Sequence, residues 1–140
     1  MDLGSFGSIA VLGIAAIGSA IGAGTAGQAA IGAWKRNYLA NKPASFLLVI
    51  FAGAPLTQTI YAFILLQRML TSTKDPAMLL GAGVIGGLGM AMSAIVQGQA
   101  GAVSADAFGE TGKGFGLYIT VVGLCETVAL FVMAFSFGAL

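Results

Sequence analysis

Residues 115–137, FGLYITVVGLCETVALFVMAFSF, are almost wholly apolar, and Glu126 is the one charged residue among them. About 20 consecutive apolar residues are enough for an α-helix to cross a bilayer. The composition agrees, since 58% of the 140 residues are hydrophobic, 8% are charged, and the mean hydropathy is +0.97. A water-soluble domain of this size carries about a quarter charged residues. The sequence therefore predicts a membrane protein.

Three further apolar segments precede this one, at about residues 6–33, 46–66 and 77–105. Each is near or above the length that spans a bilayer. The first lacks a basic beginning and is too long for a cleavable signal peptide, which leaves it as a membrane helix. Nearly all remaining charges fall in the three connections, at Lys35, Arg36, Lys42, Arg68, Lys74, Asp75, Asp106, Glu110 and Lys113. We expect an all-α membrane protein with four transmembrane helices.

The basic residues predict an orientation in the cell membrane. The loops at residues 34–45 and 106–114 together hold four of the six Lys and Arg residues. Cytoplasmic loops carry an excess of Lys and Arg. Both loops are therefore expected in the cytoplasm, and both termini outside.

Other features exclude several kinds of function. A net charge of +1 offers no basic face for nucleic acid. Histidine, the usual proton shuttle and metal ligand, is absent, and Cys125 has no second cysteine with which to pair. GAGTAG (22–27) and GAGVIG (81–86) match the dinucleotide fingerprint, but both lie within apolar spans, where that motif has no meaning.

The chain contains an internal duplication. GQA at 27–29 recurs at 98–100, and LTQTIYAF at 56–63 aligns with LCETVALF at 124–131. The chain is thus predicted to be two tandem helical hairpins, 1–73 and 74–140, with pseudo-symmetric packing. Gln58 of the first hairpin takes the place of Glu126 in the second.

The odd-numbered apolar segments are rich in glycine. Gly18 and Gly22, and then Gly83 and Gly87, have the GxxxG spacing that lets membrane helices approach closely. The other two segments carry the bulky aromatic residues. We expect the thin helices to pack inside, the bulky ones to face lipid, and close contacts to continue between copies of the chain.

Glu126 is a functional candidate because one charge at mid-bilayer costs about 3 kcal/mol or more on insertion scales. The plainer interpretation is a protonated Glu that joins two helices by a hydrogen bond. Residues equidistant from a loop lie at one depth in antiparallel helices. Gln97 and Glu126 are equidistant from the third loop, and Gln58 and Gln97 from the second. The three side chains are therefore predicted to share one depth.

More polar groups are expected at that level. Thr57 and Tyr61 are four residues apart and share a helix face, and Thr127 follows Glu126. Pro55 has no backbone N–H, so a helix carbonyl near it is left available. Since the first hairpin has Ala26 where the second has Gln97, one site per chain is expected.

With APLTQTIY (54–61), VQGQA (96–100), CET (125–127) and the duplicated hairpins, the whole chain resembles the membrane rotor proteolipids of V-type ATPases. These are the subunit K or c-type ring subunits, and the sodium-transporting bacterial kind is the most similar. The resemblance implies a non-catalytic subunit of a homo-oligomeric ring that turns against a stator subunit while ATP is hydrolysed elsewhere. It also implies an Arg of the stator facing Glu126, central-stalk subunits at the cytoplasmic loops, and no organic cofactor.

The resemblance further implies the residues that hold the ion. The ligands would be Thr57, Gln58, Gln97, Glu126 and the backbone carbonyl of Ala54, with Tyr61 holding Glu126 by a hydrogen bond. Cations such as Na⁺ need several hard oxygen ligands, whereas a proton needs only the carboxylate and one acceptor. The oxygens favour Na⁺, with an H⁺-translocating ring as the alternative. Two other hypotheses are a dimeric four-helix cation or drug antiporter and a purely structural packing protein.

Overall fold

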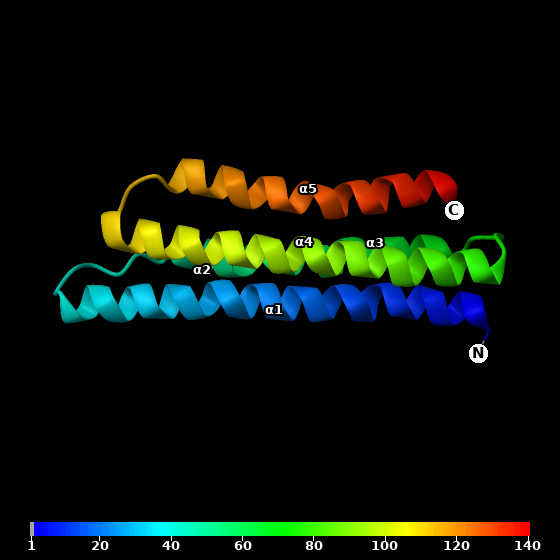
Figure 1. Cartoon of the computed structure of the whole chain (residues 1–140), viewed down its shortest axis with the longest axis horizontal. Helices are drawn as coiled ribbons and strands as arrows, with labels where there is room; N and C mark the ends of the chain where they lie inside the picture. Colours follow the sequence, from blue (N-terminus) through cyan, green and yellow to red (C-terminus); the bar gives the residue numbers. More distant parts are fainter. Residues whose placement is uncertain (1) are drawn as a thin grey trace.

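The computed structural model describes residues 2–140, which form helices and connecting turns with no strand among them (Figure 1). The elements in chain order are α1 (Leu3–Leu39), α2 (Leu48–Gly53), the 3₁₀ helix η1 (Ala54–Leu56), α3 (Thr57–Leu70), α4 (Pro76–Thr111) and α5 (Phe115–Ala139). Because α2, η1 and α3 follow one another without a gap, the described chain has four long apolar rods, each able to cross a membrane. The predicted all-α class with four spans is confirmed, and the chain is a multi-pass membrane protein.

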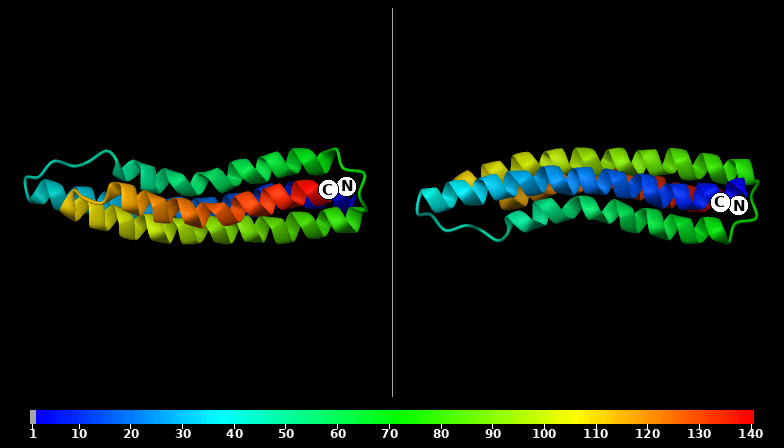
Figure 2. Two further views of the ribbon diagram at one scale, coloured as in Figure 1. Left: turned by 90° about the horizontal axis from the view of Figure 1, so that it is seen from above. Right: turned by 90° about the horizontal axis from the view of Figure 1, so that it is seen from below.

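The rods run antiparallel along one axis (Figure 2). The α1–α2 and α4–α5 connections lie at one end, and the α3–α4 connection lies at the other, with both termini. An exposed ion pair, Arg36 Nη2 to Asp106 Oδ1 at 2.9 Å, joins α1 to α4 toward the first end. The connection from Leu70 to Pro76 contains the expected division between the hairpins at 73 and 74.

Two helices are longer than their apolar segments. The 37 residues of α1 and the 36 of α4 exceed the roughly 20 that cross a bilayer. The predicted loops were therefore too long: residues 34–39 belong to α1 and 106–111 to α4. Charged residues such as Lys35, Arg36 and Asp106 are part of these helices. The helices end instead near Asn41 (φ 53°) and at Gly112 (φ 66°), where the backbone turns left-handed.

The glycines bring the α1 and α4 backbones into contact. A Cβ added at Gly18 would lie 2.3 Å from Ala91 Cα, and one at Gly83 would lie 2.0 Å from the Gly7 carbonyl oxygen. No side chain fits at such distances, so only glycine allows this approach. The expected close packing of the two glycine-rich helices is confirmed.

Bulky side chains lie mostly on the outside. Phe46, Phe63, Phe131 and Phe135 are exposed, as expected for a surface in lipid. Phe51 is an exception, since it is fully buried and packs on Phe115 with the ring centroids 5.4 Å apart.

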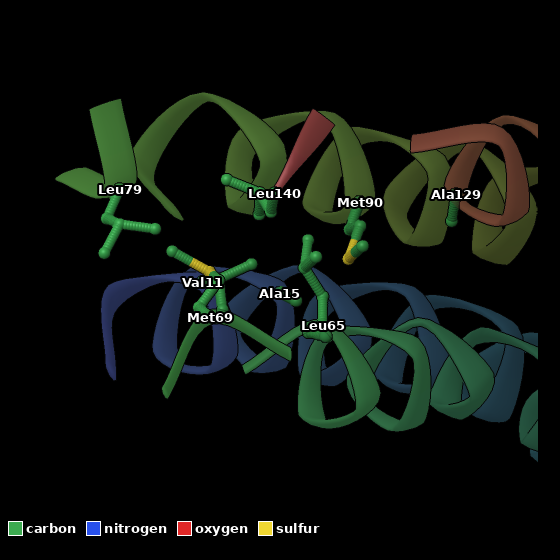
Figure 3. Packing of buried hydrophobic residues seen from close by; sticks show 9 residues of the cluster. Val11, Ala15, Leu65, Met69, Leu79, Met90, Ala129 and Leu140 are labelled. Atoms are coloured by element: carbon green, nitrogen blue, oxygen red, sulfur yellow. The ribbon is translucent and has the colours of Figure 1, made fainter. Parts of the chain in front are cut away.

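Two apolar clusters fill the inside of the bundle. The first lies toward the termini and contains Val11, Ala15, Ala62, Leu65, Met69, Leu79, Met90, Ala129 and Leu140 (Figure 3). The second lies toward the other end and contains Ala30, Ala33, Leu48, Phe51, Ala105, Phe108 and Val122. Gln58, Gln97 and Glu126 fall between them on their respective helices, so apolar packing closes the polar level from both sides.

Candidate ion-binding site

Two fully buried amides form the inner part of the site. Gln58 on α3 and Gln97 on α4 each have 0% exposed surface. Gln58 Nε2 donates to Gln97 Oε1 at 2.7 Å. Buried amides are tolerated only when their polar atoms are paired. This pair therefore ties the first hairpin to the second.

Glu126 on α5 is half-buried and accepts a hydrogen bond on each carboxylate oxygen. Gln97 Nε2 donates to Oε2 at 3.2 Å, and the Tyr61 hydroxyl donates to Oε1. The structure thus brings Gln58, Gln97 and Glu126 together, at the common depth that the loop spacings predict. Tyr61 also lies where the resemblance puts it.

The break in the second rod provides a group of oxygens. In the 3₁₀ turn at Pro55, the Ala54 carbonyl accepts both the backbone N–H of Thr57 and its hydroxyl, the latter at 3.0 Å. Thr57 Oγ1 also lies 3.2 Å from Gln58 Oε1. Oxygen atoms about 3 Å apart are close enough to share one cation. Ala54, Thr57 and Gln58 therefore form one wall of the site.

Pro55 supports the site in a different way from the one expected. The carbonyl that loses a helical partner to a proline is the one four residues earlier, which here belongs to Phe51. The Phe51 carbonyl oxygen lies against α4, where a Cβ at Gly101 would be 2.8 Å away. The Phe51 carbonyl oxygen therefore packs against α4. The Ala54 carbonyl is placed by the 3₁₀ turn.

Thr127 does not join the site. Its hydroxyl donates to the Leu124 carbonyl of its own helix at 2.7 Å. This back-bond is a common use of Thr inside a helix. The expected support of Glu126 by this hydroxyl is not found.

Two groups were missed by the sequence reasoning. Ser93 Oγ donates to the Cys125 carbonyl at 2.8 Å and accepts from Gln58 Nε2 at 3.2 Å. The Val122 carbonyl accepts from Gln97 Nε2 at 3.0 Å. Ser93 had a signal in the sequence, because it precedes Gln97 by four residues and so shares its helix face.

The hydrogen bonds leave one lone pair on each amide oxygen for a ligand. Both N–H groups of Gln58 are donated, to Ser93 and Gln97, and both of Gln97 are donated, to Val122 and Glu126. Each amide oxygen accepts only one hydrogen bond from a side chain, and an amide oxygen has two lone pairs. The amides are thus oriented to offer oxygen.

Among residues 2–140, no Lys or Arg forms an ion pair with Glu126. Within residues 2–140 the one ion pair is Arg36–Asp106, and no group of three or more His, Cys, Asp or Glu side chains could hold a metal ion. Ile60, Phe63 and Leu124, which are close to Tyr61 or Glu126 in the sequence, are at least half exposed, so this part of the surface contains large apolar side chains. A charge in such a place needs a partner that binds from outside the chain.

A four-helix membrane bundle with one carboxylate that accepts hydrogen bonds from the Gln97 amide and the Tyr61 hydroxyl defines the class as a membrane proteolipid. Comparisons with known proteins give the particular family. Residues 80–138, which include Gln97 and Glu126, match the family model of the C subunit of ATP synthase. The chain is also similar to A-type ATP synthase subunit K of Methanocaldococcus jannaschii, with 33% identity over 132 residues. The predicted resemblance to the V-type rotor proteolipids is supported by both comparisons, and the relative itself is named as A-type.

The two comparisons cover different parts of the chain. The alignment with the subunit K protein spans 92% of this chain and 57% of the relative, so the chain spans a little over half of that relative's length. The family model covers the second hairpin alone, the one that carries the carboxylate. The family agrees with the expectation of a non-catalytic membrane subunit.

Proposed function

We propose that this chain is the ion-carrying subunit of the rotor ring of a V- or A-type ATPase. It carries Na⁺ across the membrane on Glu126, while ATP is hydrolysed by other, soluble subunits. The match to the ATP synthase family model and the relative named A-type ATP synthase subunit K support the rotor assignment. The observation that carries the ion assignment is the group of amide, hydroxyl and carbonyl oxygens of Ala54, Thr57, Gln58 and Gln97, which lies next to the carboxylate through the Gln97 amide.

Identical copies stand side by side in the ring. The described chain supports this through apolar side chains exposed on every rod, among them Ile17, Ile60, Ile85, Val103 and Phe135. Such surfaces are stable against lipid or a neighbouring copy. A membrane protein of the stator contributes an Arg that meets the empty Glu126. Central-stalk subunits dock at the end that carries residues 34–45 and 106–114, which is cytoplasmic, and both termini lie outside.

Ion loading controls whether a copy of the chain can face lipid. With Na⁺ bound, Glu126 and the ion form a neutral pair. Without it, one carboxylate charge must stay away from hydrocarbon, at a cost of about 3 kcal/mol or more. Only a loaded copy, or one opposite the stator Arg, can therefore move. Each ion crossing costs about 2.3 kcal/mol per 100 mV of membrane potential, which ATP hydrolysis supplies.

The number of oxygens at the site favours Na⁺ over H⁺. Both carboxylate oxygens accept one bond, from Tyr61 and from Gln97, and each keeps a second lone pair for an ion. Five oxygens are more than a proton requires and are typical for a hard cation. Ala54, Thr57, Gln58, Gln97 and Glu126 are the proposed ligands.

An H⁺-carrying ring remains the second candidate, supported by the same carboxylate. A dimeric antiporter is disfavoured by the family match. Particle size after gentle extraction separates these classes, because a ring is large and a dimer is small.

Protection against a carboxyl-modifying carbodiimide tests the ion assignment. In membranes that contain the assembled complex, Na⁺ should slow modification of Glu126 at a fixed pH above the range in which the carboxyl protonates. K⁺ at equal concentration is the control for ionic strength. Protection that depends on pH alone would assign the site to H⁺ and the amides to packing.

A further inference from the structure

Ser93 lies where the three site helices meet. It is one turn before Gln97 on α4 and only 5% exposed. Its hydroxyl donates to the Cys125 carbonyl on α5 at 2.8 Å and accepts from Gln58 Nε2 on α3 at 3.2 Å. One hydroxyl thus connects α3, α4 and α5 at the level of the carboxylate.

The direction of these bonds decides what Gln58 can present. A hydroxyl has a single proton, and Ser93 gives its proton to Cys125. Toward Gln58 it offers lone pairs only, so the amide must place its nitrogen there. Gln97 Oε1 takes the second N–H of the same nitrogen. Gln58 Oε1 is therefore turned toward Thr57 Oγ1, 3.2 Å away.

The reverse orientation of the amide is disfavoured. It would place Gln58 Oε1 against the lone pairs of Ser93 Oγ and of Gln97 Oε1, and both of these acceptors would lose the N–H that they now bind. Unpaired buried polar groups of this kind cost roughly 1–3 kcal/mol each in general. Ser93 is not itself one of the proposed ligands.

We propose that Ser93 is a positioning residue for cation selectivity: it fixes the Gln58 amide with its oxygen toward the ion. This inference rests on the proposed function. Proton binding at Glu126 needs no oxygen from Gln58, because that amide does not contact the carboxylate in the described hydrogen bonds. Loss of Ser93 should weaken Na⁺ binding and leave proton binding unchanged.

The test compares Ser93→Ala with the wild type by carbodiimide modification of Glu126 in membranes that hold the assembled complex. The Na⁺ concentration for half-protection should rise roughly three- to tenfold, the usual effect of one hydrogen bond. The pH dependence of modification in Na⁺-free buffer should not move. Ser104→Ala is the matched control, because Ser104 is 6% exposed on the same helix and bonds only the Ala100 carbonyl.

A second pair of variants keeps the test valid if Ser93→Ala does not assemble. Ser93→Thr and Ser93→Val have nearly the same volume and differ by the hydroxyl. Na⁺ should protect the Thr variant at several-fold lower concentration than the Val variant. The role of Ser93 would be overturned if Na⁺ protected Ser93→Ala as well as the wild type, or the Val variant as well as the Thr variant. A shift of the pH profile in parallel with the Na⁺ profile would also overturn it. If Na⁺ does not protect the wild type, the proposed function itself fails.

Discussion

At the scale of single residues, the charge of Glu126 can be separated from its hydrogen bonds. Glu126→Gln keeps the size of the side chain and an oxygen that can accept from Tyr61 or Gln97, but it removes the negative charge. We expect the ring to assemble in normal amount while Na⁺ transport and Na⁺-coupled ATPase activity are lost. Transport into vesicles and ring yield in detergent measure the two effects. A variant that still pumps Na⁺ would exclude Glu126 as the carrier.

The amide of Gln97 is expected to contribute directly to affinity. Gln97→Leu keeps a similar volume and removes the ligand oxygen together with the N–H that holds Glu126. We predict at least a tenfold loss of apparent Na⁺ affinity, about 1.4 kcal/mol. Na⁺ protection of Glu126 measures this loss.

Gln99→Leu is the control for that variant. Gln99 is exposed, whereas Gln97 is fully buried. Its substitution should leave the affinity for Na⁺ unchanged. Equal losses at the two positions would mean that the ion contacts a different face of α4.

The sequence was sufficient to predict the site residues whose chemical type is unusual in a membrane helix. An acid or amide inside an apolar helix stands out, and the loop spacings place Gln58, Gln97 and Glu126 at one depth. Hydroxyls do not stand out, because Ser and Thr often bond their own helix. Thr127 does so here, and Ser93 does not. The choice depends on which carbonyl a neighbouring helix presents, and that needs the packed structure.

At the scale of elements, the contact between α1 and α4 depends on glycine. Gly83→Ala puts a Cβ 2.0 Å from the Gly7 carbonyl oxygen, where backbone must move to make room. Overpacking of this kind costs at least about 1–3 kcal/mol. We expect a lower ring yield and a lower temperature of thermal aggregation in detergent.

Gly81→Ala is the matched control on the same helix. A Cβ there meets no atom of the chain within 4 Å, and alanine is the better helix former. Its yield should equal that of the wild type. If both variants behave alike, glycine-mediated contact is not what holds the two helices together.

The sequence predicted which elements form but not where they end. Apolar length defines the part of a helix in hydrocarbon, and α1 and α4 continue beyond it through charged residues. Similarly, Pro55 indicated a disturbance in the second rod. The 3₁₀ turn that follows, and the role of Phe51 at Gly101, depend on the packing of α2 against α4.

At the scale of the whole molecule, the two ends of the bundle should lie on opposite sides of the membrane. Lys42 and Lys74 are exposed. Lys42 lies in the α1–α2 connection and Lys74 in the α3–α4 connection, and these connections are at opposite ends of the bundle. In a Cys125→Ser background, Lys74→Cys should react with an impermeant thiol reagent in intact cells. Lys42→Cys should react only after permeabilisation. The reverse pattern would show that the positive-inside prediction is wrong for this chain.

The duplication also limits the number of sites. Gln58 occupies in the first hairpin the place that Glu126 has in the second, so each chain has one membrane carboxylate. The most direct test is equilibrium binding of radioactive Na⁺ to the purified ring. We predict that the wild-type ring binds one Na⁺ per chain and that the Glu126→Gln ring binds none. Binding that persists in the Glu126→Gln ring, or the absence of Na⁺ binding in the wild type, would contradict Glu126 as the Na⁺ carrier.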